Sequence, residues 1–328
     1  MLILIAPHEF GHFIVAKLVG VKVNEFAIGM GPELWSRQKG ETKYTLRAVP
    51  IGGYNAMEGE DADSEDPRGF NNQTPLRRIA ILIAGVSMNV LIAIIVCTII
   101  VQMNGVAINQ LDQVAAGSPA AIAGLEQGDK IGAVNGVPTE KWTDVTAAID
   151  KFDPETDKTL ELTALRNGKE VPLTVVPKFN EESQRYMIGI TAAVSKNPLR
   201  CIGGGLELTK NLNDSMLQSF GMLFSGKVSS DDVSGPVGLV KIVNETTQMG
   251  AQSYLLLLAL VSLNLALINM LPIPALDGGK ILFVIVKSIT RGKVTDEMEY
   301  KATMIGFTLL LMLIVFVTVN DIGNLFGL

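Results

Sequence analysis

The two histidines of this 328-residue chain both lie in one pentapeptide, His8-Glu9-Phe10-Gly11-His12. On a helix, residues i and i+4 share one face, about 5–6 Å apart between Cβ atoms, so both imidazoles can bind one metal ion. This HExxH spacing is typical of zinc sites in which the glutamate is the general base toward a water molecule. Apolar residues flank the pentapeptide (MLILIAP and FIVAKLVGV), and ionisable groups in a membrane helix usually mark function. The pattern therefore predicts a hydrolytic zinc site within a bilayer.

Two other interpretations of the pentapeptide are open. HExxH also arises by chance on solvated helix faces, although no polar periodicity surrounds it here. A buried histidine pair without metal is the second alternative. With no third histidine in the chain, the third protein ligand has to be a carboxylate or a cysteine. The carboxylates in or beside the later apolar segments are Asp277, Glu297, Glu299 and Asp321.

The two cysteines are weak candidates for that ligand. Cys97 and Cys201 are far apart in the sequence, and neither lies in a CxxC pair. They are expected to be a packed thiol in a membrane helix and a lone thiol, rather than a disulfide or a metal site.

The composition is that of a membrane protein that also carries a soluble domain. Hydrophobic residues make up 48% of the chain and charged residues 18%, with mean hydropathy +0.34. The net charge of −6 and the pI near 5.1 argue against nucleic-acid binding. A span needs about 20 largely apolar residues. The expected fold is a polytopic α-helical membrane protein with four transmembrane helices, at residues 1–21, 79–102, 252–286 and 302–320.

Basic residues in the connecting segments predict the orientation. Residues 22–78, expected to form a hairpin and an acidic loop, end in Arg77-Arg78, directly before the second span. The loop 287–301 is also basic, so the positive-inside rule places both segments in the cytoplasm. Residues 103–192 and the following segment 193–251 then lie outside it, together with both termini. We expect a multi-pass protein of the plasma (inner) membrane.

Residues 103–192 are expected to form a compact α+β insert. The stretch Gly117–Gly136 (GSPAAIAGLEQGDKIGAVNG) predicts a short helix followed by a strand and an Asn-Gly hairpin turn. This stretch resembles a bacterial PDZ domain, a fold that binds extended peptides by strand addition. Binding of peptides, exclusion of large substrates and simple spacing of the helices are open alternatives. The elements expected in it are strand 131–135, helix 144–151 and strands 158–166 and 169–176.

Three further segments carry a recognisable pattern. Apolar residues recur at helical spacing over 198–226, which predicts an amphipathic helix on the outer membrane surface or packed on the insert. The acidic run 58–66 is most simply a solvated cytoplasmic loop. Residues 42–50 alternate and lead into Ile51-Gly52-Gly53-Tyr54, which predicts a β-hairpin.

Asp277 stands out among the carboxylates because of its context, NMLPIPALDGG over residues 269–279. Pro272 and Pro274 break the apolar span, since proline lacks the amide donor and clashes with the preceding turn. Broken helix at membrane depth is tolerated where it lines a cavity. The carboxylate is therefore expected to point inward; a proline-terminated span with a surface aspartate is the alternative.

Together, HEFGH in the first span, the PDZ-like insert and the Asn269…Pro272-x-Pro274-x-Leu276-Asp277-Gly278 pattern resemble the site-2 protease family of intramembrane zinc proteases. The order of parts is similar to the branch of the bacterial regulator of sigma-E protease, with a single PDZ domain, over nearly the whole chain. The resemblance implies that His8, His12 and Asp277 bind Zn²⁺ and that Glu9 is the catalytic base. It also implies that Asn269 hydrogen-bonds near the substrate or the developing oxyanion.

The resemblance also assigns a role to the hairpin. In the family this region resembles a hairpin that enters the membrane from the cytoplasmic side; an ordinary cytoplasmic hairpin is the alternative. The residues expected to contact substrate are Gly52, Gly53, Tyr54, Pro272 and Pro274. One departure concerns the start of the chain. Only seven residues precede His8, and Pro7 favours a helix that begins near it.

The predicted function is hydrolysis of peptide bonds within transmembrane segments of single-span membrane proteins such as anti-sigma factors. The expected partners are these substrates, the lipid bilayer and peptide or protein segments at the PDZ domain, with no nucleic acid. One alternative is a catalytically inactive membrane scaffold that binds peptides through its PDZ domain. Another is a transporter with an ion site at the midplane, but transporters usually contain internal repeats, and none is evident.

Overall fold

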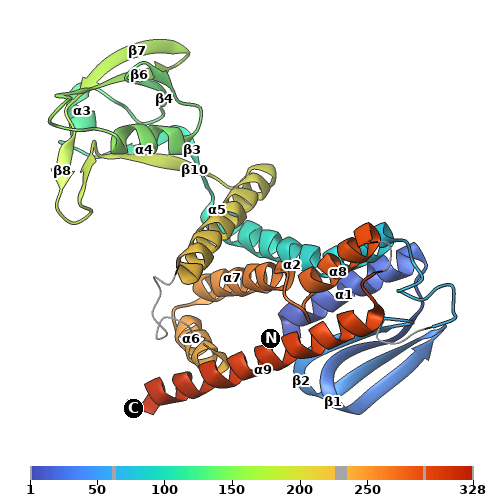
Figure 1. Cartoon of the computed structure of the whole chain (residues 1–328). Coiled ribbons are helices and arrows are strands. Elements are labelled where there is room, and N and C mark those ends of the chain that lie inside the picture. Colours follow the sequence, from blue (N-terminus) through green and yellow to red (C-terminus); the bar gives the residue numbers. More distant parts are fainter. Residues whose placement is uncertain (1, 61–63, 226–234, 291–292, 327–328) are drawn as a thin grey trace. The chain divides into compact units, whose positions relative to one another are not determined.

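The computed structural model describes residues 2–60, 64–225, 235–290 and 293–326 (Figure 1). The chain divides into two compact units. We call residues 1–100 with 205–328 the membrane unit and residues 101–204 the inserted unit. Each is described by itself.

Helices dominate the membrane unit. Among the described residues, three helices are long and apolar enough to cross a membrane: Pro75–Asn104, Ala251–Met270 and Glu297–Gly323 within α9. The first expected span corresponds to α1, which is not among these three, so the count of four spans stays a prediction. The helices are α1 (Leu2–Val19), α2 (Pro75–Asn104), α5 (Pro198–Phe224), α6 (Pro236–Gln248), α7 (Ala251–Met270), α8 (Asp277–Thr290) and α9 (Asp296–Phe326).

Several helix boundaries differ from the expected ones. The expectation that the first helix begins near Pro7 is wrong, because α1 already begins at Leu2 and contains Pro7. A proline there removes one backbone hydrogen bond, which the rest of the helix tolerates. The segment 287–301, expected as a loop, is largely helical, since α8 extends to Thr290 and α9 begins at Asp296.

The hairpin of the membrane unit is longer than its alternating pattern indicated. β1 (Val23–Lys39) and β2 (Thr42–Met57) are antiparallel, and register shifts bend both strands. As a result, residues 25–28 of β1 pair with residues 43–46 on one side and with residues 53–56 on the other. The last part of β2 therefore forms the sheet edge that lies next to α1 (Figure 1).

The acidic run after the hairpin is not simply a solvated loop. Glu58 accepts hydrogen bonds from Ser64, Asn24 and Lys22, which lower its pKa to about 2. Glu60 is paired with Lys280 of α8, with 2.6 Å between Oε1 and Nζ. The acidic run by itself does not indicate which residues elsewhere in the chain pair with its carboxylates. For this reason the sequence predicted only a solvated loop. Residues 61–63 of the run lie outside the described residues.

The inserted unit is a small α+β fold with strand order β5-β4-β6-β7, while β3 pairs with β10 and β8 with β9. Its core is apolar, with Leu111, Ile131, Leu160 and Leu162 almost completely buried. The strand pair around the Asn167-Gly168 turn lies where the sequence predicts it. The elements are β3 (Val106–Val114), α3 (Pro119–Ala123), β4 (Lys130–Val134), β5 (Val137–Pro138), α4 (Trp142–Asp150), β6 (Leu160–Arg166), β7 (Lys169–Val175), β8 (Lys178–Asn180), β9 (Arg185–Met187) and β10 (Ile190–Ser195).

A two-point ion pair fastens one end of this sheet. Asp129, 1% exposed, accepts from Arg166 Nε at 2.8 Å to Oδ1 and from Arg166 Nη2 at 2.8 Å to Oδ2. The Arg166 guanidinium holds the pKa of Asp129 below its usual range. Because the folded-state pKa is lowered, the pair stabilises the unit above the ordinary aspartate pKa and loses that effect as the pH falls.

We expect Arg166→Leu to lower the free energy of unfolding of the inserted unit near neutral pH by about 1–3 kcal/mol, because it leaves a buried carboxylate without its partner. The difference from the unsubstituted chain should shrink as the pH is lowered from about 7 to about 3. Urea unfolding followed by Trp142 fluorescence, in a Trp35→Phe background, measures both. Arg185→Leu, which removes an arginine without an ion pair in the described structure, is the matched control. A difference that is constant with pH would contradict this assignment.

Candidate active site

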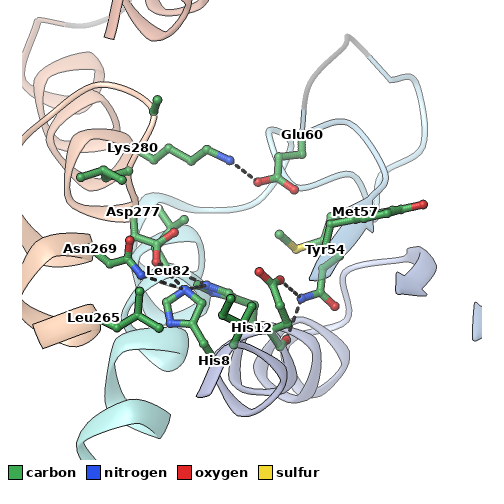
Figure 2. Close-up of a pocket in the computed structure, with 15 residues that line it drawn as sticks. His8, His12, Tyr54, Met57, Glu60, Leu82, Leu265, Asn269, Asp277 and Lys280 are labelled. Atoms are coloured by element: carbon green, nitrogen blue, oxygen red, sulfur yellow. Dashed lines mark hydrogen bonds and ion pairs between the residues drawn. The ribbon is translucent and has the colours of Figure 1, made fainter. Parts of the chain in front are cut away.

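The HExxH pentapeptide lies within α1, which places its two histidines on one face (Figure 2). Both are buried, at 7% exposure each, and their Nε2 atoms lie 3.1 Å apart. The rings are almost perpendicular, with an interplanar angle of 87°. The expected i, i+4 geometry is therefore present, with both ring nitrogens directed at a common point.

Asp277 approaches this point from the break between α7 and α8. Its Oδ2 atom lies 3.2 Å from His8 Nε2 and 3.4 Å from His12 Nε2. Asp277 is the first residue of α8, and the chain before it bends so sharply that Ala275 adopts φ +82°. Such a value is uncommon for a residue with a Cβ atom. The two prolines thus end α7 and turn the carboxylate toward α1, as predicted.

The three atoms fit a zinc ion on geometric grounds. Ligands about 2.0–2.1 Å from a tetrahedral zinc lie about 3.3 Å from one another, which is close to the triangle formed here. Asp277 Oδ2 is buried and has no hydrogen-bond donor aligned to it. Since two imidazole nitrogens and a carboxylate oxygen converge without enough protons to satisfy one another, a cation at their centre would satisfy all three. Among the described residues, no other cluster of His, Cys, Asp or Glu offers such a site.

The other nitrogen of each imidazole is also held in place. His12 Nδ1 lies 2.8 Å from the Ile81 carbonyl oxygen, so it carries the proton and leaves Nε2 as the ligand atom. His8 Nδ1 lies 3.2 Å from the side-chain amide of Asn89, which is fully buried in α2. The Asn89 backbone carbonyl in turn accepts from Ser262 of α7 at 2.8 Å. Asn89 was not predicted from the sequence, although an asparagine inside an apolar span without charged residues can indicate a buried polar contact.

Close packing of α1 on α2 makes this arrangement possible. Gly85 of α2 faces His12, and a Cβ atom there would lie 2.2 Å from His12 Nε2. Gly11 of α1 faces Ala84, whose carbonyl oxygen would lie 2.4 Å from a Cβ atom. Small residues at both positions let the two helices approach closely enough for the imidazole to reach the site.

Glu9 is held by the hairpin. The Asn55 side-chain amide of β2 donates to Glu9 Oε2 at 2.8 Å and to the Glu9 carbonyl oxygen at 2.6 Å. Gly53 lies against the same side chain, since a Cβ atom there would be 3.3 Å from Glu9 Cγ. Asn55 was not predicted from the sequence, because nothing in the sequence links it to α1.

A cavity of about 430 Å³ is lined by His8, Glu9, His12, Asn55 and Asp277. Of the other predicted residues, Asn269 and Tyr54 line it, and Asn269 Nδ2 lies 3.4 Å from His8 Nε2. Gly52, Gly53, Pro272 and Pro274 do not line it; the prolines form the bend before Asp277 instead. The Lys280–Glu60 ion pair crosses from α8 to the loop after β2 (Figure 2). The lining residues are Ile5, His8, Glu9, His12, Tyr54, Asn55, Met57, Glu60, Leu82, Leu265, Asn269, Ala275, Leu276, Asp277 and Lys280.

The other candidate carboxylates are engaged elsewhere. Glu297 pairs with Lys301, and Glu299 pairs with Lys287. Asp321 of α9 accepts from the backbone amides of Gly235 and Gly238, at 3.0 and 2.8 Å, at the start of α6. Both cysteines are buried free thiols outside the cluster. Asp277 is therefore the carboxylate that joins the two histidines.

Comparison with known proteins identifies the family. Residues 1–313 match peptidase family M50. The chain belongs to this family. A protein of Clostridium acetobutylicum that is named as a zinc metalloprotease is 37% identical to this chain, over 98% of this chain and 94% of its own length. The Bacillus subtilis regulator of sigma-W protease RasP is 28% identical over 97% of this chain and 95% of its own length.

One solved structure is similar to part of this chain. The PDZ domain of a Listeria innocua SdrC-like protein matches 28% of this chain and 96% of its own chain, with 19% identity and a TM-score of 0.24.

The protein is thus a zinc metalloendopeptidase of the site-2 protease type. Zn²⁺ is its cofactor, and its apolar helices make it a multi-pass membrane protein. The transporter interpretation is thereby excluded, and the predicted family is confirmed.

We expect purified protein to hold stoichiometric zinc and to lose it in His8→Ala, His12→Ala and Asp277→Ala, because each removes one of three converging ligands. Metal analysis of the purified variants is the measurement. Glu297→Ala, which removes a carboxylate paired with Lys301, is the matched control and should keep its zinc. Full retention of zinc by Asp277→Ala would place the third ligand elsewhere.

Proposed function

We propose that this protease hydrolyses peptide bonds inside the transmembrane segments of single-span membrane proteins, with anti-sigma factors as one substrate class. The observation that carries the proposal is the joint placement of His8, His12, Asp277 and Glu9 in one cavity beside apolar helices. The similarity to a protein named regulator of sigma-W protease supports the substrate class.

The chemistry follows from the donor set. Zinc, when bound by His8, His12 and Asp277, supplies Lewis acidity to a carbonyl group and makes a water molecule more acidic. Glu9 takes a proton from the attacking water and returns it to the leaving amine. Glu9 follows His8 directly in the sequence, and its carboxylate lines the same cavity. It would therefore reach both the water oxygen and the nitrogen of the leaving amine.

Substrate has to be unwound before it reaches Glu9, because a membrane helix satisfies its backbone groups internally. The edge formed by residues 53–56 of β2 offers backbone groups beside the cavity, which supports strand addition as the way to hold an extended segment. Gly52, Gly53 and Tyr54 would contact the substrate there. Asn269 would hydrogen-bond to the substrate carbonyl or the developing oxyanion, while Pro272 and Pro274 would act by shaping the bend before Asp277.

The outer part of the hairpin is suited to a lipid environment. Several large apolar side chains on it are exposed, which supports its insertion into the membrane from the cytoplasmic side. Its turn is polar, and Glu41 there is paired with Lys17 and Arg68. The exposed apolar residues are Met30, Leu34, Trp35, Leu46 and Val49.

The inserted unit would serve as a PDZ domain on the extracytoplasmic side. A groove of about 150 Å³ lies between α4 and residues 185–190, which supports the binding of an extended peptide or protein segment. Size exclusion of large substrates is compatible with the same unit. The catalytically inactive scaffold receives no support from the site, because all four catalytic and ligand residues are brought together.

Glu9→Gln separates an enzyme from a scaffold most sharply. The amide is nearly isosteric and leaves both histidines free to bind zinc, but it cannot accept a proton from water. We expect zinc content and membrane insertion to be kept, while cleavage of a helical membrane substrate falls by about 10²–10⁴-fold. Initial cleavage rates in proteoliposomes are the measurement, with Glu33→Gln at the exposed hairpin as the control. Cleavage by Glu9→Gln at the unsubstituted rate would exclude the catalytic role.

The orientation predicts that residues 104–250 lie outside the cytoplasm and residues 22–78 and 287–301 inside. With Cys97 and Cys201 replaced, Asp157→Cys should react with an impermeant thiol reagent added to intact cells. Glu65→Cys should react only after the membrane is opened. Asp63, in the same cytoplasmic segment, lies outside the described residues, so Glu65 is the better position. Labelling of position 65 from outside would reverse the topology.

A further inference from the structure

We propose that Asn55 is a positioning residue for the catalytic base: its amide fixes the Glu9 carboxylate to the hairpin, so that strand β2 and helix α1 together define where the base stands. This inference rests on the proposed role of Glu9. It adds a residue outside the HExxH and Asp277 motifs to the machinery of the reaction.

The hydrogen bonds of Asn55 restrain both ends of Glu9. A single nitrogen, Nδ2, donates to the carboxylate Oε2 at 2.8 Å and to the carbonyl oxygen of the same residue at 2.6 Å. An amide nitrogen has two protons, so both are engaged by Glu9. Since the backbone and the tip of one side chain bind the same group, the rotations between them are restricted. Oε2 is occupied, and Oε1 is left to take the proton from water.

Asn55 is itself fixed by the sheet and by an aromatic cluster. In the register of the hairpin it lies opposite Phe26, which is 8% exposed. The Phe26 ring packs against Phe13 of α1 at 5.1 Å and against Phe10 at 6.4 Å between centroids. Apolar packing thus docks the hairpin onto α1 at two positions that follow Glu9 in the sequence, and the amide does not have to hold the two elements together alone.

Gly53 supports the same arrangement from the neighbouring position on that face of the strand. Residues two apart in a strand point to the same side, so Gly53 and Asn55 both face α1. A Cβ atom at position 53 would be 3.3 Å from Glu9 Cγ and 2.9 Å from the Ala27 carbonyl oxygen. The strand therefore lies against the stem of Glu9 through Gly53 and binds its carboxylate through Asn55.

This restraint would keep the Glu9 carboxylate in the position that proton transfer requires. Glu9 lies next to a metal ligand, and a freely rotating carboxylate there could turn toward the metal position or away from the cavity. A neutral amide donor directs the carboxylate without placing another charge beside the ligands. Misplacement of a catalytic group by about 1 Å can cost about 10²-fold in rate, so a lost restraint should appear in kcat.

The test compares Asn55→Leu and Asn55→Asp with the unsubstituted chain in proteoliposomes containing a helical membrane substrate. Leucine keeps the volume without the donor, and aspartate keeps the shape but presents a second carboxylate to Glu9. We expect kcat to fall by about 10²-fold in Asn55→Leu and at least as far in Asn55→Asp. KM and zinc content should stay near those of the unsubstituted chain.

Asn24→Ala is the matched control. Asn24 of β1 donates to Glu58 Oε2 at 2.9 Å, so this variant removes an amide–carboxylate bond from the same hairpin outside the cavity, and kcat should be unchanged. An unchanged kcat in Asn55→Leu would overturn the inference. So would a rise in KM alone, which would make Asn55 a substrate contact, or an Asn55→Asp variant as active as the unsubstituted chain.

Glu9→Gln in the same assay separates this inference from the proposed function. If Glu9→Gln is inactive and the Asn55 variants keep their kcat, only the positioning role fails. If Glu9→Gln cleaves normally, the base assignment itself fails. Should Asn55→Leu lose zinc or fail to insert, Asn55→Asp, which keeps the side-chain shape, decides the question through its kcat.

Discussion

The convergence of two imidazole nitrogens and one carboxylate oxygen within 3.4 Å is the constraint on which the rest of the membrane unit depends. Without a cation, three acceptors would face one another in a buried space, which is costly. The close packing at Gly85, the bend before Asp277 and the amide beside His8 all serve to bring these atoms together. The arrangement of these three atoms therefore fits a metal ion, and the packing of the surrounding helices maintains this arrangement.

A second constraint comes from the substrate. Backbone groups of a membrane helix are paired internally, and a protease has to present replacement partners at the depth of its site. In the proposed function the hairpin would meet this need, because it brings a sheet edge and polar side chains next to α1 without adding charge to the spanning helices. Its exposed apolar side chains would suit the proposed position of the hairpin in lipid.

The parts of the site that could be predicted from the sequence are those encoded locally. Helical spacing gave the pair His8 and His12, and two prolines followed by glycines marked Asp277. Asn55 and Asn89 could not be found in this way, because each acts on α1 from an element far along the chain. The same limit explains Glu58 and Glu60, whose partners are set by tertiary packing. The amphipathic helix and the strands of the inserted unit followed from periodicity and turn residues, which act over short distances.

The proposed metal ligands and the proposed base are supported by different elements. His8, His12 and Asp277 are positioned by contacts among α1, α2 and the start of α8, whereas the carboxylate of Glu9 is held from β2. In the proposed function the strand that holds Glu9 is also the edge that binds substrate, so an extended segment paired with this edge would first affect the position of Glu9. The metal ligands, fastened by helix packing, would be disturbed less. Under the proposed function, such a division would let the site keep its metal while the hairpin adjusts to substrate. The strand that would bind the segment to be cut, β2, would then also align Glu9.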